Sequence, residues 1–289
     1  MTDFSSKITL ITGGARGLGR LLALKIAARG SHVVLWDIDD ESLAKVAEEI
    51  SAAGNNVTTY LCDVSQREMI YKIADKVRNE VGNVDIIINN AGVVTGKPFL
   101  ECKDEQINRT MEINMMAHFW TVKAFLPDMI AANSGHIVTV ASAGGIVGSA
   151  RLVDYSASKF AAFGFDEALR AELKKQKLEI HTTVVCPYFI KSEMFAGVRT
   201  KFSFLLPILD AEHVSEQIVK AIARKRRRLV MPQFVYTTWL LRLVPVDLFD
   251  WVTTLLGVNN AMDSFQGRQS RGSENEELNS KRQAPDSDQ

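Results

Sequence analysis

The stretch KITLITGGARGLG, residues 7–19, contains the successive parts of a dinucleotide-binding loop. Its first five residues are mostly apolar and β-branched, which favours a strand. Glycines follow at positions 13, 14, 17 and 19, and apolar residues at helical spacing begin at Leu21. A strand, a glycine turn and a helix in this order place the free N–H groups of the helix start against a pyrophosphate. The GxxxGxG spacing departs from the common GxGxxG, so the flanking strand and helix carry this prediction.

Three glycines of this loop have separate expected tasks. Gly13 permits the tight turn, and Gly17 lets the pyrophosphate approach the backbone. Gly19 lets the helix pack closely on the strand. These tasks predict a phosphate-binding turn at the start of the chain.

Two charged residues bear on the choice between NAD and NADP. The second strand, HVVLW at residues 32–36, ends in Asp37, which lies eighteen residues after Gly19. An acid at this distance accepts hydrogen bonds from the adenine ribose and repels a 2′-phosphate, which favours NAD. Arg16, inside the glycine loop, favours NADP, because it can reach a 2′-phosphate. We give Asp37 more weight, because it would bind the ribose hydroxyls directly, and we therefore expect NAD.

The sequence YSASK, residues 155–159, is a candidate catalytic motif. Its four-residue spacing places Tyr155 and Lys159 on one face of a helix, about one turn apart. There the ammonium of Lys159 would lower the pKa of the Tyr155 phenol, because a nearby positive charge favours the phenolate. A YxxxK pair occurs by chance on many solvated helices, so its weight here comes from the dinucleotide loop that accompanies it.

Together these motifs resemble the short-chain dehydrogenase/reductase family. The matches extend over residues 12–192, and the fold that they imply extends to about residue 231. The family's catalytic tetrad falls on Asn114, Ser142, Tyr155 and Lys159, with Ser142 thirteen residues before Tyr155. The resemblance implies cofactor contacts at these positions: Gly13, Arg16, Gly17, Leu18, Gly19, Asp37, Asp63, Val64, Asn90, Ala91, Gly92, Tyr155, Lys159, Pro187, Ile190 and Ser192.

The resemblance also implies a role for each tetrad residue. Tyr155, as phenolate, would take the proton of an alcohol while hydride leaves the carbinol carbon for the nicotinamide. Ser142 would hydrogen-bond the substrate oxygen. Lys159 would hold the nicotinamide ribose and lower the Tyr155 pKa, and Asn114 would keep a water in line with Lys159. Hydride transfer with proton exchange to solvent is the activity that these roles imply.

The chain departs from the family pattern at CPYFIKSEMF, residues 186–195. Tyr188 stands where the family usually has glycine, and a bulky residue cannot adopt a positive φ cheaply. We therefore expect the turn beside the nicotinamide to differ. With this variant, the WDI after the second strand and NAMDSF ending at Phe265, the chain is similar to the epidermal retinol dehydrogenases and the lipid-droplet 17β-hydroxysteroid dehydrogenases. Those animal enzymes carry an amino-terminal membrane anchor, which we do not expect here.

Strand-like and helix-like stretches alternate along the chain, which predicts a parallel sheet. Further strands are expected at 57–61, 84–88, 136–140 and 180–185, and helices at about 40–53, 66–81, 104–132, 153–176 and 211–224. Ser65 and Glu68 have the spacing of a capping box. The resemblance implies an α/β Rossmann fold, with a doubly wound, parallel, seven-stranded sheet of order 3-2-1-4-5-6-7 and helices on both faces. We divide the chain into a catalytic domain (1–231), an apolar carboxy-terminal arm (232–265) and a disordered tail (266–289).

Composition excludes several classes of function. The chain has 289 residues and 34 charges of each sign, so we expect no nucleic-acid partner. Its three cysteines are odd in number and form no CxxC, which favours unpaired thiols in a reducing compartment. Its five histidines show no zinc-ligand spacing, so we expect no metal site. The chain starts MTDFSSK, without the apolar run of a secretory signal, and we expect it to be cytoplasmic.

Residues 229–262 are rich in bulky apolar side chains, but prolines and charges interrupt them before they could span a bilayer. Either this arm packs on the domain or a second subunit, or it forms an amphipathic hairpin that contacts a membrane or covers a lipophilic pocket. The basic run at 224–228 is either a lipid contact or a solvated helix end.

The segment expected to cover the substrate, residues 188–210, is apolar and indicates a lipophilic alcohol or carbonyl such as retinol, a steroid or a fatty alcohol. One alternative is an NADPH-dependent reductase of a lipophilic ketone. Another is a non-catalytic, NAD-sensing, membrane-associated scaffold, against which the intact tetrad argues. The resemblance implies a homodimer or homotetramer through the helices at 104–132 and 153–176.

Overall fold

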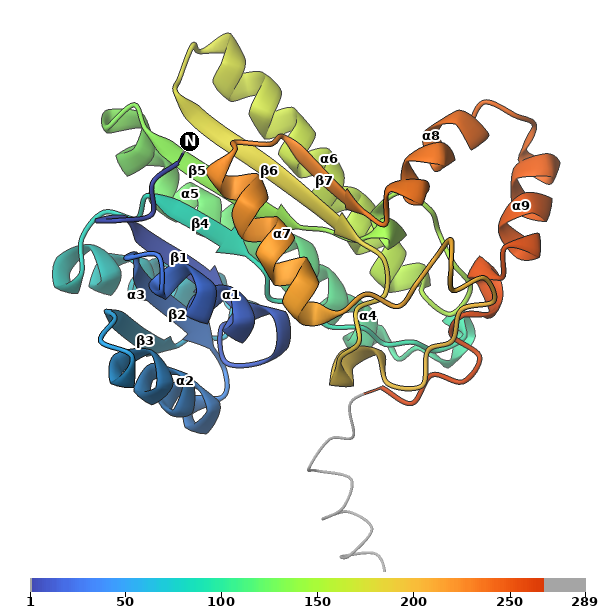
Figure 1. The fold of residues 1–289 in the computed structure, drawn as a ribbon, viewed down its shortest axis with the longest axis horizontal. Coiled ribbons are helices and arrows are strands. Elements are labelled where there is room, and N and C mark those ends of the chain that lie inside the picture. The colour runs from blue at the N-terminus through green and yellow to red at the C-terminus, as the bar shows by residue number, and fades with distance from the viewer. Residues whose placement is uncertain (1, 268–289) are drawn as a thin grey trace, which may run out of the picture.

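A parallel sheet forms the centre of the molecule (Figure 1), as seen in a computed structural model that describes residues 2–267. Within these residues seven strands pair in the order β3-β2-β1-β4-β5-β6-β7, which confirms the predicted topology. The strands are β1 (Ile8–Thr12), β2 (His32–Asp37), β3 (Val57–Leu61), β4 (Ile86–Asn89), β5 (Gly135–Val140), β6 (Ile180–Pro187) and β7 (Arg228–Met231).

Helices cover both faces of this sheet (Figure 1). The described helices are α1 (Gly17–Ala27), α2 (Asp40–Ala52), α3 (Arg67–Glu80), α4 (Asp104–Met111), α5 (Ala117–Ala131), α6 (Val153–Lys175), α7 (Ala211–Ala223), α8 (Thr237–Leu241) and α9 (Val246–Leu255). One apolar core joins α1, α2 and α7 to the sheet, and another joins α3, α5 and α6 to its other face. Burial on both faces explains why most strands, such as β2 and β4, are continuous apolar runs rather than alternating ones, whereas the edge strand β3 is only partly buried.

The structure corrects the expected helices at two points. The helix expected over 104–132 is interrupted by a π-helical turn, Glu112–Met116, which separates α4 from α5. The expected capping box is wrong: Gln66 occupies the N-cap of α3, and the Ser65 hydroxyl instead donates to Asp63 at 2.7 Å. With Gln66 at the N-cap, Ser65 lies one residue before it, and the N–H and hydroxyl of Ser65 both donate to the Asp63 carboxylate.

The carboxy-terminal arm follows β7 and lies at one end of the molecule (Figure 1). It consists of a 3₁₀ turn, Gln233–Tyr236, then α8 and α9 and a second 3₁₀ turn, Val258–Asn260. None of the described helices has the length and apolar character needed to cross a membrane. The basic run at 224–228 ends in the first residue of β7, and the Arg228 guanidinium lies over the Trp239 ring of α8, at 4.8 Å from the centroid. Most of the expected disordered tail, residues 268–289, lies outside the described residues.

Candidate active site

A cavity of about 1190 Å³ lies at the carboxyl ends of the strands. Its lining begins at the glycine loop, passes Tyr155 and Lys159, and ends at the arm. Every residue predicted to bind the cofactor contributes to this lining. The strand ends of a doubly wound sheet are the usual place for a ligand, so the position agrees with the sequence-based expectation.

The glycine loop has the conformation that its sequence predicts. Gly13 has φ +66° and Gly17 has φ +50°, values that side chains rarely allow. At Gly19 a Cβ would lie 1.9 Å from the Gly13 carbonyl oxygen, so only glycine permits this close packing. Helix α1 starts at Gly17 without a capping side chain or an acid in its first turn. Its free N–H groups therefore suit the pyrophosphate of a dinucleotide.

Asp37 and Arg16 lie on the same side of the cavity. The Asp37 carboxylate accepts hydrogen bonds from the Ala15 N–H at 3.0 Å and the Ile38 N–H at 2.8 Å, which fix its position beside the glycine loop. Arg16 forms an ion pair with Asp39, and its Nε donates to the Ser42 hydroxyl at 3.0 Å. The guanidinium therefore already has an acidic partner within the protein.

Asn90 joins the loop after β4 to the glycine loop. Its amide donates to the carbonyl oxygens of Thr12 at 3.0 Å and Gly13 at 3.1 Å. The Thr12 hydroxyl in turn accepts from the N–H groups of Asn90 at 3.0 Å and Ala91 at 3.1 Å. Thr12 was not among the expected site residues, because a threonine at a strand end carries no distinctive sequence signal.

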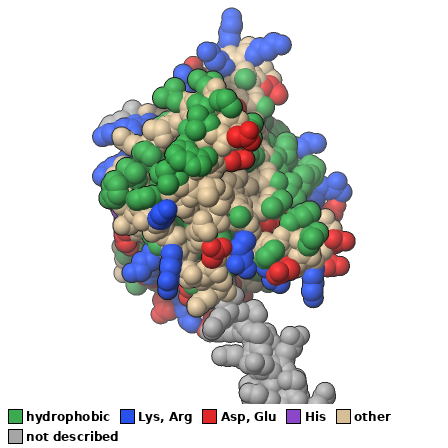
Figure 2. All heavy atoms as spheres, turned by 90° about the vertical axis from the view of Figure 1, so that its right-hand side faces the viewer, with side chains coloured by type: hydrophobic (Ala, Val, Ile, Leu, Met, Phe, Trp, Pro, Cys, Tyr) green, Lys and Arg blue, Asp and Glu red, His purple; other side chains and the backbone are tan. Residues whose placement is uncertain are grey.

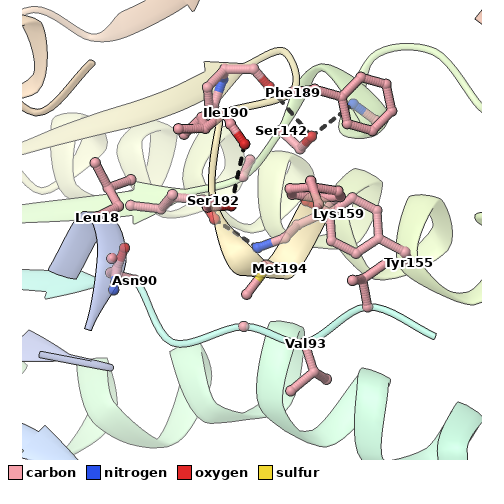
Figure 3. A pocket seen from close by; sticks show the side chains of 18 of the residues that line it. Leu18, Asn90, Val93, Ser142, Tyr155, Lys159, Phe189, Ile190, Ser192 and Met194 are labelled. Carbon is pink, nitrogen blue, oxygen red and sulfur yellow. Dashed lines mark hydrogen bonds between the residues drawn. The ribbon is translucent and has the colours of Figure 1, made fainter. Parts of the chain in front are cut away.

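Ser142, Tyr155 and Lys159 meet in the middle of the cavity, with Phe189 and Ile190 of the segment after β6 nearby (Figure 3). Ser142 follows β5, and its hydroxyl accepts from the Gly144 N–H at 3.0 Å. Tyr155 and Lys159 lie one turn apart on α6, as the YSASK spacing predicts. The Lys159 ammonium is 5.8 Å from the Tyr155 ring centre and donates to the Val140 carbonyl at 2.8 Å.

Burial sets the pKa values of this pair. It raises the pKa of Tyr155 to about 12, and the hydrogen bond with Ser142 acts in the opposite direction. It also lowers the pKa of Lys159 to about 8. The expectation that Lys159 lowers the Tyr155 pKa is therefore not met in the protein alone. The Lys159 ammonium is held by the Val140 carbonyl, 5.8 Å from the Tyr155 ring centre, and burial of the phenol outweighs the effect of this charge on the Tyr155 pKa.

Asn114 lies in the π-helical turn behind Lys159. A Cβ on Gly92 would be 3.3 Å from the Asn114 Oδ1 and 3.6 Å from the Lys159 Nζ, so both side chains adjoin Gly92. The Asn114 amide exchanges hydrogen bonds with the Val93 backbone at 2.8 and 2.9 Å and donates to Ser158 at 3.0 Å. The side chain thus braces the loop after β4 against α6. Such π-turns occur often at functional sites.

The far end of the cavity is apolar. The segment after β6 contributes Phe189, Phe195 and Leu206, and the arm contributes Leu241 and Leu256. Of the alternatives left open for the arm, the structure shows packing on the domain, through Val235, Ala261 and Met262, and Leu241 and Leu256 of the same arm also line the cavity. Tyr188 does not have a positive φ, as expected for a bulky residue, and its N–H donates to the Met231 carbonyl at 2.7 Å.

The sequence matches known proteins over most of its length. A family model described as short chain dehydrogenase matches residues 7–202. Epidermal retinol dehydrogenase 2 of Homo sapiens is 47% identical over 268 residues, which cover 91% of this chain and 86% of that protein. This relative confirms the expected similarity to the epidermal retinol dehydrogenases.

Solved structures show the same fold. A short-chain dehydrogenase/reductase from Burkholderia phymatum, in complex with NAD, superposes with a TM-score of 0.75 at 28% identity, covering 84% of this chain and 95% of that one. A metagenomic short-chain oxidoreductase in complex with NADP has a TM-score of 0.68 at 27% identity, covering 80% and 98%. The two neighbours bind different nicotinamide cofactors, so the comparison supports a nicotinamide site in general.

Proposed function

This chain belongs to the short-chain dehydrogenase/reductase family and is an oxidoreductase acting on CH–OH groups, and we propose that its substrates are lipophilic alcohols or carbonyls. The observation that carries this proposal is the continuity of the cavity. Three tetrad residues, Ser142, Tyr155 and Lys159, lie between a cleft suited to a dinucleotide and a chamber whose lining includes Phe189, Phe195, Leu206, Leu241 and Leu256. Retinol-like, steroid-like and long-chain alcohols have the apolar surface that such a chamber binds.

The chain's own residues divide the chemistry between them. Tyr155 exchanges the proton of the substrate hydroxyl, and Ser142 hydrogen-bonds the substrate oxygen as its charge changes. Lys159 holds the nicotinamide ribose and places its charge near the Tyr155 ring. The bound nicotinamide supplies the acceptor or donor of hydride. Asn114 acts through position, because its side-chain hydrogen bonds hold the loop at Val93 and the residue next to Lys159.

We propose that NAD is the preferred cofactor. Asp37 is fixed beside the glycine loop, where its charge would repel a 2′-phosphate. Arg16, the residue that favours NADP, is engaged by Asp39 and Ser42. This pairing removes the support for an NADPH-dependent reductase. The non-catalytic scaffold is not favoured, because Ser142, Tyr155 and Lys159 line one cavity with the glycine loop.

We also propose peripheral membrane contact through the arm. Helices α8 and α9 and the link between them expose apolar side chains, among them Leu240 (71% exposed) on α8, Leu243 (82%) in the link and Trp251 (60%) on α9. Figure 2, which faces the arm, shows hydrophobic side chains gathered in patches on this side. Arg228 of the basic run at 224–228 adjoins this arm through its contact with the Trp239 ring. A cytoplasmic location stays a prediction from the sequence.

For assembly, we propose a homodimer or homotetramer through the helices at 104–132 (α4 and α5) and 153–176 (α6), as the family resemblance implies. Exposed apolar side chains on these helices, including Phe119 and Ile130 on α5 and Val153 on α6, support the proposal. Light scattering coupled to size exclusion should give twice or four times the mass of the 289-residue chain. A monomer at micromolar concentration would contradict it.

A substrate panel tests the main proposal. Reduction of NAD would be followed with retinol, steroid alcohols, long-chain primary alcohols and short secondary alcohols, and repeated with NADP. We expect higher kcat/KM for lipophilic alcohols than for short ones, and for NAD than for NADP. Preference for a sugar or polyol would exclude the substrate class, and preference for NADP would exclude the cofactor assignment.

A further inference from the structure

The loop of residues 143–152 connects two tetrad residues, Ser142 and Tyr155. Its first turn is the 3₁₀ helix Ala143–Gly145, for which Ser142 is the N-cap. Gly145 packs directly on α6, because a Cβ there would lie 2.4 Å from the Lys159 carbonyl oxygen. The Gly145 N–H also donates to the Ser142 carbonyl at 2.9 Å. The position of this turn on α6 therefore sets the position of Ser142 relative to Tyr155.

Arg242, at the end of α8, holds this turn from the outside. Its Nε and Nη2 donate to the Ile146 carbonyl oxygen at 3.2 and 2.6 Å. The guanidinium also lies over the Phe160 ring, at 5.3 Å from the centroid, and near the Phe249 ring, at 5.7 Å. Phe160 directly follows Lys159 on α6, and Phe249 belongs to α9. One side chain thus connects both arm helices, the catalytic helix and the loop that carries Ser142.

The other hydrogen bonds between the arm and the loop are weaker, because one has a neutral donor and the other is long. The Ser149 hydroxyl donates to the Val258 carbonyl at 2.9 Å, and an Arg151 nitrogen lies 3.4 Å from the Asp263 carbonyl. Both reach the far half of the loop. Arg242 contributes two hydrogen bonds from a charged donor and acts at the turn next to Ser142. Gly144, Gly145 and Gly148 give the loop backbone freedom that such a contact restricts.

We propose that Arg242 is a positioning residue, which fixes the loop 143–152 on α6 and thereby holds Ser142 at its distance from Tyr155. The proposal rests on the proposed oxidoreductase function of this site. It makes the arm part of the catalytic unit as well as the cover of the apolar chamber. Arg242 itself touches no reacting atom and is absent from the lining of the cavity.

Kinetics separate positioning from substrate binding. Arg242→Ala should lower kcat about tenfold or more for short and long alcohols alike, because a lost charged hydrogen bond disturbs Ser142 for every substrate. The KM for NAD should stay unchanged. Leu241→Ala, one residue earlier and on the cavity lining, should instead raise KM for long alcohols only. Arg242→Lys, which keeps the charge without the planar fork, should restore part of kcat.

Hydrogen exchange of the loop provides a test that needs no substrate. In the full chain, the amides of residues 143–152 should exchange about tenfold faster in Arg242→Ala than in the wild type, with and without NAD. Arg67→Ala is the matched control, because Arg67 also stacks on an aromatic ring, at 5.7 Å from Trp120, but lies off the cavity. If Arg242→Ala does not fold, Phe249→Leu takes its place, because it removes a ring that packs against the Arg242 guanidinium.

The outcomes are distinct. Faster loop exchange with a lower kcat for all alcohols supports the proposal. Unchanged loop exchange, or a kcat for short alcohols within about twofold of the wild type, overturns it. If the wild type oxidises no alcohol, the proposed function fails, and the exchange measurement still decides whether Arg242 holds the loop.

Discussion

Lys159 is a buried charge, and replacing it should show by how much this active-site residue lowers the free energy of unfolding. The side chain is 3% exposed, and burial lowers its pKa from 10.5 to about 8. A difference of 2.5 pKa units corresponds to about 3 kcal/mol of destabilisation while the lysine is protonated in both states. Lys159→Met removes this penalty but leaves the Val140 carbonyl without its donor, which costs about 1–3 kcal/mol. At pH 7 we therefore expect the variant to be inactive and at least as stable as the wild type.

The pH dependence gives a sharper test. Below pH 8 the lysine is protonated in the folded and unfolded chain, so the full penalty applies. Between pH 8 and 10.5 only the folded state loses its proton, and wild-type stability should rise relative to the variant. From pH 7 to pH 9.5 the gain should be about 2 kcal/mol. Cysteines and tyrosines that titrate in the same range are present in both proteins, so their contributions cancel when the stability of the variant is subtracted from that of the wild type.

Urea unfolding of the cofactor-free proteins at the two pH values measures this quantity. Lys45→Met, which removes an exposed lysine of α2, is the control and should show no such pH-dependent difference. A wild-type minus Lys159→Met difference that stays constant within about 0.5 kcal/mol, below the effect of half a pKa unit, would refute the account of Lys159 as a strained, buried charge.

Four further predictions concern catalysis, the cofactor and the arm. Tyr155→Phe should abolish turnover while NAD affinity, measured by fluorescence titration, stays nearly unchanged; activity above a few per cent would remove Tyr155 from proton transfer. Because the pKa of Tyr155 is raised, alcohol oxidation should accelerate from pH 6 to pH 9, and a rate that is flat over this range would contradict a phenolate base. Asp37→Ala should raise kcat/KM for NADP about tenfold or more by removing one charge near the 2′-phosphate; a wild type that already prefers NADP would end this explanation. The protein should co-sediment with liposomes, and Leu243→Glu with Trp251→Glu should release it; binding that survives both changes would place the contact elsewhere.

Local sequence patterns predicted most of the sheet, because most strands are buried on both faces and read as apolar runs. The strand at 57–61 was predicted with its observed bounds, and α6 ends one residue before its predicted end at 176. The π-turn at Asn114 was missed, because the extra residue shifts the helical periodicity just before α5, whose apolar residues do not keep to one face, so the shift leaves no clear signal. The wrong capping box at Ser65 shows that the spacing of a serine and a glutamate does not by itself locate a helix start, whose N-cap lies one residue later at Gln66.

The catalytic positions could be matched from the sequence, but their electrostatics could not. The spacing of Tyr155 and Lys159 indicated that both lie on one helix face, which the structure shows. It could not show that Lys159 is directed at Val140 or that both groups are buried. The role of the arm was likewise open, because α8 and α9 are too short for periodicity to reveal which face is covered. Only the tertiary structure shows Leu241 toward the cavity and Leu240 toward solvent.

The most direct test of the central claim follows the transferred hydrogen itself. A lipophilic alcohol deuterated at its carbinol carbon would be incubated with the full chain and NAD, and the nucleotide analysed by mass spectrometry. We predict deuterium on the nicotinamide ring with the wild type, at a higher kcat/KM than for a short deuterated alcohol, and none with Tyr155→Phe. A wild-type protein that binds NAD but transfers no deuterium from any alcohol, long or short, would contradict it.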